Sequence, residues 1–137
     1  MTRIVLVAAS TAILAAATGS AHAGVNVQGA YAMQLNKSCL SGSGPSTTVE
    51  YGQASFKLST KALTITGFED TITPSNTYGT ETSVSTVEPY NYTDTTLTIG
   101  LFVFHAYYKA VVKGIATTIL FGGVDPAGCI ETGTLIQ

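Results

Sequence analysis

Residues 101–113, LFVFHAYYKAVVK, carry an apolar side chain at every even position from Phe102 to Val112, while the odd positions include His105 and Lys109. Successive side chains of a β-strand leave opposite faces of the sheet, so this alternation is typical of a strand with one face in a core and one in water. On a helix, the aromatic residues of this segment would spread around the axis instead of forming one face. The segment therefore predicts a long strand whose even positions face a core.

Similar alternation recurs along most of the chain, in short segments separated by turn residues. Residues 41–46, SGSGPS, and 122–128, GGVDPAG, are rich in the residue types that favour turns and loops. Residues 78–87 form the most polar stretch and fit either an edge strand or a long loop. The other expected strands are 27–35, 50–58, 62–72, 88–93, 96–100, 115–121 and 129–136.

The expected strands follow one another with short turns, and no helical pattern separates them. This arrangement predicts a single all-β domain of about eight strands. Because sequential strands joined by short turns pair as neighbours, an up-and-down antiparallel meander is favoured. Closing the meander into a barrel also removes its exposed sheet edges. The fold class expected is therefore an antiparallel up-and-down β-barrel.

Two glycines mark places where the inward row of side chains changes parity. Leu63 and Ile65 occupy odd positions, whereas the next large apolar residue, Phe68, occupies an even one. A β-bulge at Gly67 would bring all three to the inner face, because one extra residue reverses every later side chain. Gly100 would allow a second change before the central strand. The pattern leaves the strand register near both glycines open.

The N-terminus has the plan of a secretory signal peptide. Arg3 precedes an apolar, Ala-rich run over residues 4–17, and the small-residue triplet AHA follows at 21–23. The run is shorter than the roughly 20 residues of a membrane-spanning helix. We expect cleavage after Ala23, which leaves residues 24–137 as one exported domain, periplasmic or extracellular, with no membrane span.

The charge of the mature chain excludes several classes of partner. Removal of residues 1–23 would leave five Lys, no Arg and eight carboxylates, for a formal net charge of −3. Nucleic acid requires clustered Lys and Arg to meet its phosphates, and anionic lipid surfaces attract the same residues. Neither partner is expected.

Two cysteines, Cys39 and Cys129, predict a disulfide bond, because export brings the chain into an oxidising compartment. A zinc site is disfavoured, since the two thiols lie far apart in sequence and only His105 would remain as an imidazole ligand. The bond would join the first strand to the last, where a closed barrel benefits from a covalent link.

A family resemblance adds to this interpretation. At Gly29-Ala30-Tyr31, near the start of the first expected strand, the chain resembles the calycin or lipocalin-like barrels, which usually carry Trp where this chain has Tyr31. The order of signal peptide, G-x-Y strand, Cys39 and a last strand CIETGTL also resembles small exported bacterial proteins of uncharacterised function. The resemblance implies a barrel with an apolar interior that holds a small apolar ligand.

No residue pattern predicts catalysis, so we expect a protein that is not an enzyme and carries no cofactor or metal. His105 is expected on the outer face, without a nucleophile motif beside it. Glu69 and Asp70 form a carboxylate pair, but adjacent strand residues point to opposite faces. A solvated strand end explains this pair, and Asp125-Pro126 fits turn chemistry.

Two functions of different class remain open. The first is a binding module whose interior encloses a small hydrophobic ligand. The second is a structural or protein-interaction protein of the cell envelope whose barrel is filled by its own side chains. The pattern of alternation does not decide between them, and it leaves the oligomeric state open. The residues expected to line a ligand site are Tyr31, Phe56, Phe102, Phe104 and Tyr108.

Overall fold

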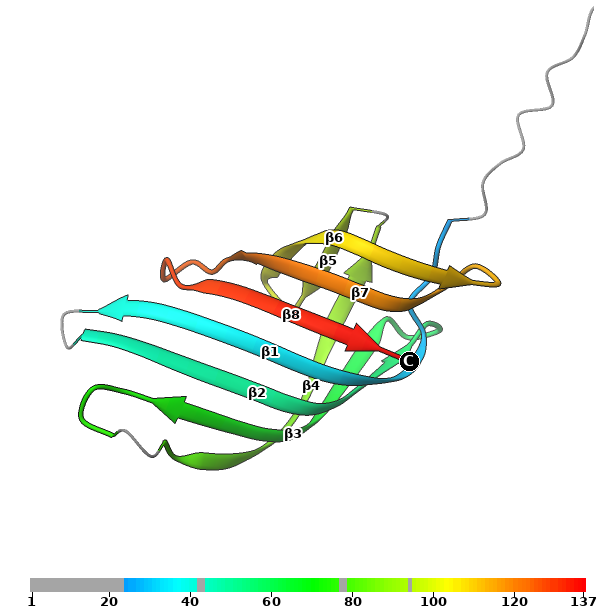
Figure 1. Ribbon diagram of the computed structural model, residues 1–137. Helices are drawn as coiled ribbons and strands as arrows, with labels where there is room; N and C mark the ends of the chain where they lie inside the picture. Colours follow the sequence, from blue (N-terminus) through cyan, green and yellow to red (C-terminus); the bar gives the residue numbers. More distant parts are fainter. Residues whose placement is uncertain (1–23, 42–43, 77–78, 94) are drawn as a thin grey trace, which may run out of the picture.

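In the computed structural model, eight strands form a closed barrel, in which each strand pairs antiparallel with the next and β8 pairs with β1 (Figure 1). The structure describes residues 24–41, 44–76, 79–93 and 95–137, so the predicted signal peptide 1–23 lies outside the described residues. The predicted up-and-down barrel is confirmed. Its strands are β1 (Gly29–Ser41), β2 (Gly44–Lys57), β3 (Ala62–Ile72), β4 (Glu81–Tyr92), β5 (Thr96–Ile99), β6 (Phe102–Val112), β7 (Ile115–Val124) and β8 (Ile130–Ile136).

The two ends of the barrel differ in what they carry. The last residues of β1, β3, β5 and β7 and the first residues of β2, β4, β6 and β8 lie at one end, which we call the open end. The β2–β3, β4–β5 and β6–β7 connections lie at the other, the packed end, together with residues 24–28 and the C-terminus (Figure 1). Cys39 and Cys129 form the predicted disulfide, with their Cα atoms 4.4 Å apart, and join β1 to the β7–β8 loop at the open end.

Aromatic side chains fill the packed end. The Tyr31 ring meets Phe56 edge-on at 5.4 Å, and Phe56 meets Tyr90 edge-on at 4.8 Å. The Tyr31 hydroxyl donates to the carbonyl of Ala116 at 2.6 Å, and the Tyr90 hydroxyl donates to the carbonyl of Val27 at 2.9 Å. Because both buried hydroxyls are satisfied, the aromatic cluster fixes the segment before β1 across this end of the barrel.

The predicted central strand is β6, but its inward row is interrupted. Phe104 is buried as expected, and Gly100, with φ +57°, turns the chain from β5 into β6. The pairing with β7 then shifts between residues 106 and 108, so a bulge at Tyr107 reverses the later side chains. Lys109 consequently pairs with buried Ile119, on the inner side, and the expectation that Lys109 faces outward is wrong.

The bulge predicted at Gly67, by contrast, is absent. β3 pairs with β2 in continuous register, with Gly67 directly opposite Gly52. Phe68 therefore lies outside the barrel, 44% exposed, with its ring 6.0 Å from that of Tyr51. The inner row continues from Ile65 past the glycine to Glu69, so a carboxylate enters the interior where an aromatic ring was expected.

The barrel wall is short on one side of the open end. β5 contains only four residues. It pairs with β6 on one side, and on the other side it reaches only Tyr90–Tyr92 of β4. Residues 81–88 of β4 pair with β3 and, within the described part of the chain, have no strand on their other side. Residues on both sides of this gap, Val84 of β4 and Leu101 of the turn from β5 to β6, line one cavity.

Candidate binding cavity

A cavity of about 570 Å³ occupies the open half of the barrel. On β2 and β3, Gly52 and Gly67 place no side chain at this level of the inner face, which leaves space there. Leu101, which is almost fully exposed, and Pro126 of the β7–β8 loop lie at its rim. Its apolar wall consists of Met33, Leu35, Ile65, Val84, Ile99, Leu101, Phe102, Phe104, Phe121 and Pro126.

Aromatic residues form the floor of the cavity. Phe104 and Phe121 are buried and meet edge-on at 5.2 Å. Gly133 of β8 lies beneath the Phe121 ring, where a Cβ atom would overlap the ring. This glycine therefore allows Phe121 to lie flat against the strand instead of filling the space above it. Phe102 continues the surface toward the rim, with its ring 6.5 Å from Phe104.

An ion-pair cluster joins three elements at one side of the cavity. Lys37 of β1 places its Nζ 2.6 Å from Asp125 Oδ2 and 3.2 Å from Glu131 Oε1. The hydrogen bond to Asp125 raises the pKa of the Lys37 ammonium against the opposing effect of burial, and Glu131 adds to the rise. Lys37 is thus shared between two carboxylates and held in its charged form.

Asp125 also organises the β7–β8 loop. Its Oδ1 accepts hydrogen bonds from the backbone N–H groups of Ala127 and Cys129, both at 2.9 Å. The bond to Lys37, followed by the bond from Cys129, lowers the pKa of the Asp125 carboxyl below its ordinary value. Since Cys129 is also tied to Cys39, the loop above the cavity is held by a covalent bond and by a charge-assisted network.

A second carboxylate pair faces the cavity from β2 and β3. Glu50 and Glu69 are direct cross-strand partners, and both line the cavity. Burial raises the pKa of the Glu50 carboxyl, and the charges of Glu69 and Glu131 raise it further. In the part of the chain that the structure describes, neither Glu50 nor Glu69 forms a salt bridge. Like charges that face each other across two strands destabilise the pair.

The predicted ligand-lining residues divide into three groups. Phe102 and Phe104 line the cavity. Tyr31 and Phe56 do not, because they pack against each other below it, in the filled half of the barrel. The side chain of Tyr108 lies outside the described residues.

The polar lining was missed by the sequence analysis. The parity of Lys37 and Glu50 matches that of the inward rows in their strands, which is the signal that could have found them. Glu69 and Asp70 were interpreted as a solvated strand end, because adjacent strand residues point to opposite faces. Asp125 was assigned to turn chemistry, and Glu131 follows a loop that hides its parity. Only their pairing across the barrel brings these residues together.

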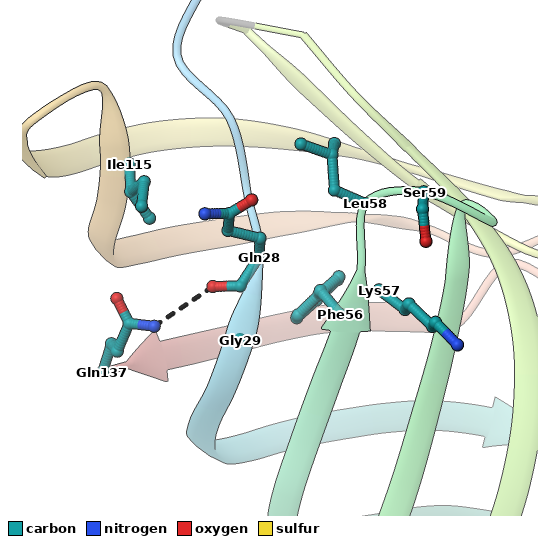
Figure 2. A pocket seen from close by; sticks show the side chains of 8 residues that line it. All are labelled: Gln28, Gly29, Phe56, Lys57, Leu58, Ser59, Ile115 and Gln137. Atoms are coloured by element: carbon teal, nitrogen blue, oxygen red, sulfur yellow. Dashed lines mark hydrogen bonds between the residues drawn. The ribbon is translucent and has the colours of Figure 1, made fainter.

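A second depression lies at the packed end, with a volume of about 630 Å³ (Figure 2). Strand β2 and its turn supply Phe56, Lys57, Leu58 and Ser59 on one side. On the other side, the Gln137 amide donates to the carbonyl of Gln28 at 3.1 Å. Gly29, Lys57, Ser59 and Gln137 are all exposed, so this depression is open to solvent. The cavity at the open end, where Met33, Ile65, Phe104 and Phe121 are buried, is the better candidate for a binding site.

Other candidate chemistry lies away from the cavity. His105 is exposed on the outer face, with its ring 5.2 Å from that of Tyr107. Among the described residues, no three His, Cys, Asp or Glu side chains are placed to hold a metal ion. The same residues contain no helix that is long and apolar enough to cross a membrane.

Comparisons with known proteins give no assignment. No protein-family model matches the chain, and no curated protein or solved structure is significantly similar to it. The closed eight-stranded barrel is compatible with a calycin-like fold. The functional conclusion must therefore come from the cavity and the residues that line it.

Proposed function

We propose that the protein is an exported, non-catalytic binding module that holds one small, largely apolar ligand in the cavity at its open end. One observation carries the proposal: the barrel is filled by side chains in one half and hollow in the other. A protein interior is normally packed to crystal-like density, and a space of about 570 Å³ falls in the usual range for small-molecule sites.

The composition of the cavity supports the same proposal. Its wall is mostly aliphatic and aromatic, as small-molecule sites usually are, and a few charged groups at fixed positions would orient the ligand. The disulfide and the Asp125 network hold the loop above it. A site of this kind is pre-formed and costs little ordering on binding. The proposal has two further parts: the barrel is a member of the calycin-like barrels, and the protein is exported.

A neutral fluorescent probe, N-phenyl-1-naphthylamine, tests the proposal. We expect saturable binding with a stoichiometry near one. Val84 of β4 faces the cavity, so Val84→Phe should narrow it and weaken binding of the probe. Val87, on the same strand but 68% exposed outside the barrel, provides the matched control, and Val87→Phe should bind the probe normally.

The structural alternative predicts a different result. If the barrel serves only as a scaffold or an interaction surface, the parent protein should show no saturable binding of the probe. Equal loss of binding in Val84→Phe and Val87→Phe would likewise place the probe outside the cavity. Either result would overturn the proposed function.

A further inference from the structure

We infer that the ligand of the open-end cavity is an organic cation with an apolar body, of the alkylammonium class. This inference rests on the proposed function and adds the charge of the ligand to it. It follows from the balance of ionised groups that line the cavity. Four glutamates line the cavity, namely Glu50, Glu69, Glu88 and Glu131, whereas Lys37 is the one cationic residue among the described lining residues.

The ammonium group of Lys37 is already committed. It lies between Asp125 and Glu131 at 2.6 and 3.2 Å, and Asp125 does not line the cavity. A carboxylate ligand would have to compete with both partners for this one cation. The ligand's negative charge would also lie close to the other carboxylates of the lining. Partial desolvation inside the barrel increases the free-energy cost of this repulsion. The lining thus disfavours fatty acids and other anionic amphiphiles.

Glu50 and Glu69 mark the position for a cationic group. They face each other across β2 and β3, and neither has a cation beside it among the described residues. Glu50 is half-buried, so water screens its charge only in part. An ammonium group between the two carboxylates would relieve their mutual repulsion.

The rest of the cavity suits the apolar part of such a ligand. Ile65 lies next to Glu69 on the inner face of β3, with only Gly67 between them on that face. The rings of Phe104 and Phe121 complete the floor, and the aromatic faces tolerate a neighbouring cation. The cavity therefore has a negative wall and an apolar floor, which match the two ends of an alkylammonium ion.

Three ligands of one chain length test the inference: octyltrimethylammonium, 1-octanol and octanoate. Each displaces N-phenyl-1-naphthylamine from the folded, oxidised protein at pH 7 and low salt. We expect octyltrimethylammonium to bind at least about tenfold more tightly than octanoate, because short-range charge interactions inside a protein are weakly screened. Octanol should fall between the two.

Two double variants locate the source of this preference. Glu50→Gln with Glu69→Gln removes two charges from the cavity, and the preference for the ammonium over octanol should fall at least about fivefold. Asp70→Asn with Glu81→Gln removes two charges from another directly opposed cross-strand pair, on the outer face of β3 and β4. This second double variant should prefer the ammonium over octanol as strongly as the parent does. Retained binding of the neutral probe shows that each variant is folded.

The outcomes separate the inference from the proposed function. If the neutral probe does not bind the parent protein, the proposed function itself fails. If the probe binds but octanoate displaces it as well as octyltrimethylammonium does, the binding function stands and the cationic ligand is wrong. If the Asp70/Glu81 double variant reduces the preference for the ammonium as much as the Glu50/Glu69 double variant does, the selectivity reflects overall charge. In that case the assignment to Glu50 and Glu69 is overturned.

Discussion

Gly52 of β2 and Gly67 of β3 face each other so closely that a Cβ atom on either one would overlap the backbone of the opposite strand. The two strands approach here because both positions lack a side chain. The close contact leaves the inner face without side-chain volume between Ile65 and Glu69 on β3. The pair thus helps to create the cavity and places a carboxylate at its wall.

The glycine contact gives the first prediction. Gly67→Ala should lower the free energy of unfolding by about 1–3 kcal/mol, the usual cost of overpacking. The new methyl group would overlap the backbone of Tyr51 and Gly52, which can make room only if strand β2 shifts. Urea denaturation followed by circular dichroism measures the change. Thr66→Ala, at the neighbouring exposed position, is the control and should change stability by less than about 0.5 kcal/mol. Equal effects at both positions would contradict the close contact.

This contact also explains where interpretation of the sequence failed. The closed barrel, most of its strands and the Cys39–Cys129 bond could be predicted, because alternation and cysteine count are properties of the chain alone. Two details differ: residues 81–92, expected as two separate segments, form the single strand β4, and residues 44–46, expected in a loop, belong to β2. The bulge at Gly67 was inferred from the assumption that Phe68 must face inward. Instead, Phe68 packs on Tyr51 outside the barrel, and apolar atoms at a protein surface are common.

The candidate site was harder to predict than the fold. The side chains of Lys37, Glu131 and Asp125 meet only because β1 pairs with β8 at the closure of the barrel. The facing of Glu50 and Glu69 depends on the register between β2 and β3. Register is a relation between strands, and the alternation within one strand does not specify it.

The central strand gives the second prediction. Phe104→Ala should cost about 3–5 kcal/mol in the free energy of unfolding, because the ring is buried against Phe121 at the floor of the cavity. His105→Ala, one residue further and exposed, should change it by less than about 0.5 kcal/mol. Chemical denaturation of both variants provides the comparison. Similar losses would mean that both faces of β6 are buried at this level.

The loop network gives the third prediction. Asp125→Asn keeps the oxygen that accepts from the Ala127 and Cys129 N–H groups but removes the charge that pairs with Lys37. The variant should therefore have a lower midpoint of thermal denaturation at pH 7. Because the pKa of Asp125 is lowered in the folded protein, its stabilising effect is present above the ordinary value of 3.8 and is lost as the pH falls through the folded pKa.

The pH dependence distinguishes this network from a general effect of charge. The difference in denaturation midpoint between the parent and Asp125→Asn should narrow as the pH is lowered below 3.8. Asp70→Asn, the same substitution on the outer face of β3, removes a charge that takes no part in the Lys37 ion pairs and should leave the midpoint at pH 7 near that of the parent. A difference for Asp125→Asn that stayed constant with pH would rule out the ion pair as its cause.

The Glu50–Glu69 pair gives the fourth prediction, with the opposite sign. The pKa of Glu50 is raised in the folded protein, so the folded state binds its proton more tightly than the unfolded state does. The parent therefore loses stability as the pH rises from the ordinary value of 4.5 through the folded pKa. Glu50→Gln does not titrate and avoids this loss. It should be more stable than the parent at pH 7 by roughly 0.2–1 kcal/mol, the range for cross-strand pairs.

Denaturation of ligand-free protein between pH 3 and pH 7 measures this effect. The advantage of Glu50→Gln should be absent at the acidic end, where the parent carboxyl is protonated, and should grow as the pH rises. Glu81→Gln removes an exposed carboxylate that accepts from the Tyr51 hydroxyl on the outer face. Because water and salt screen its repulsion with Asp70, this variant should show no such gain. A loss of stability in Glu50→Gln at pH 7 would mean that the Glu50 carboxylate has a favourable partner in the folded protein. The inference that the cavity carries an excess of negative charge would then be wrong.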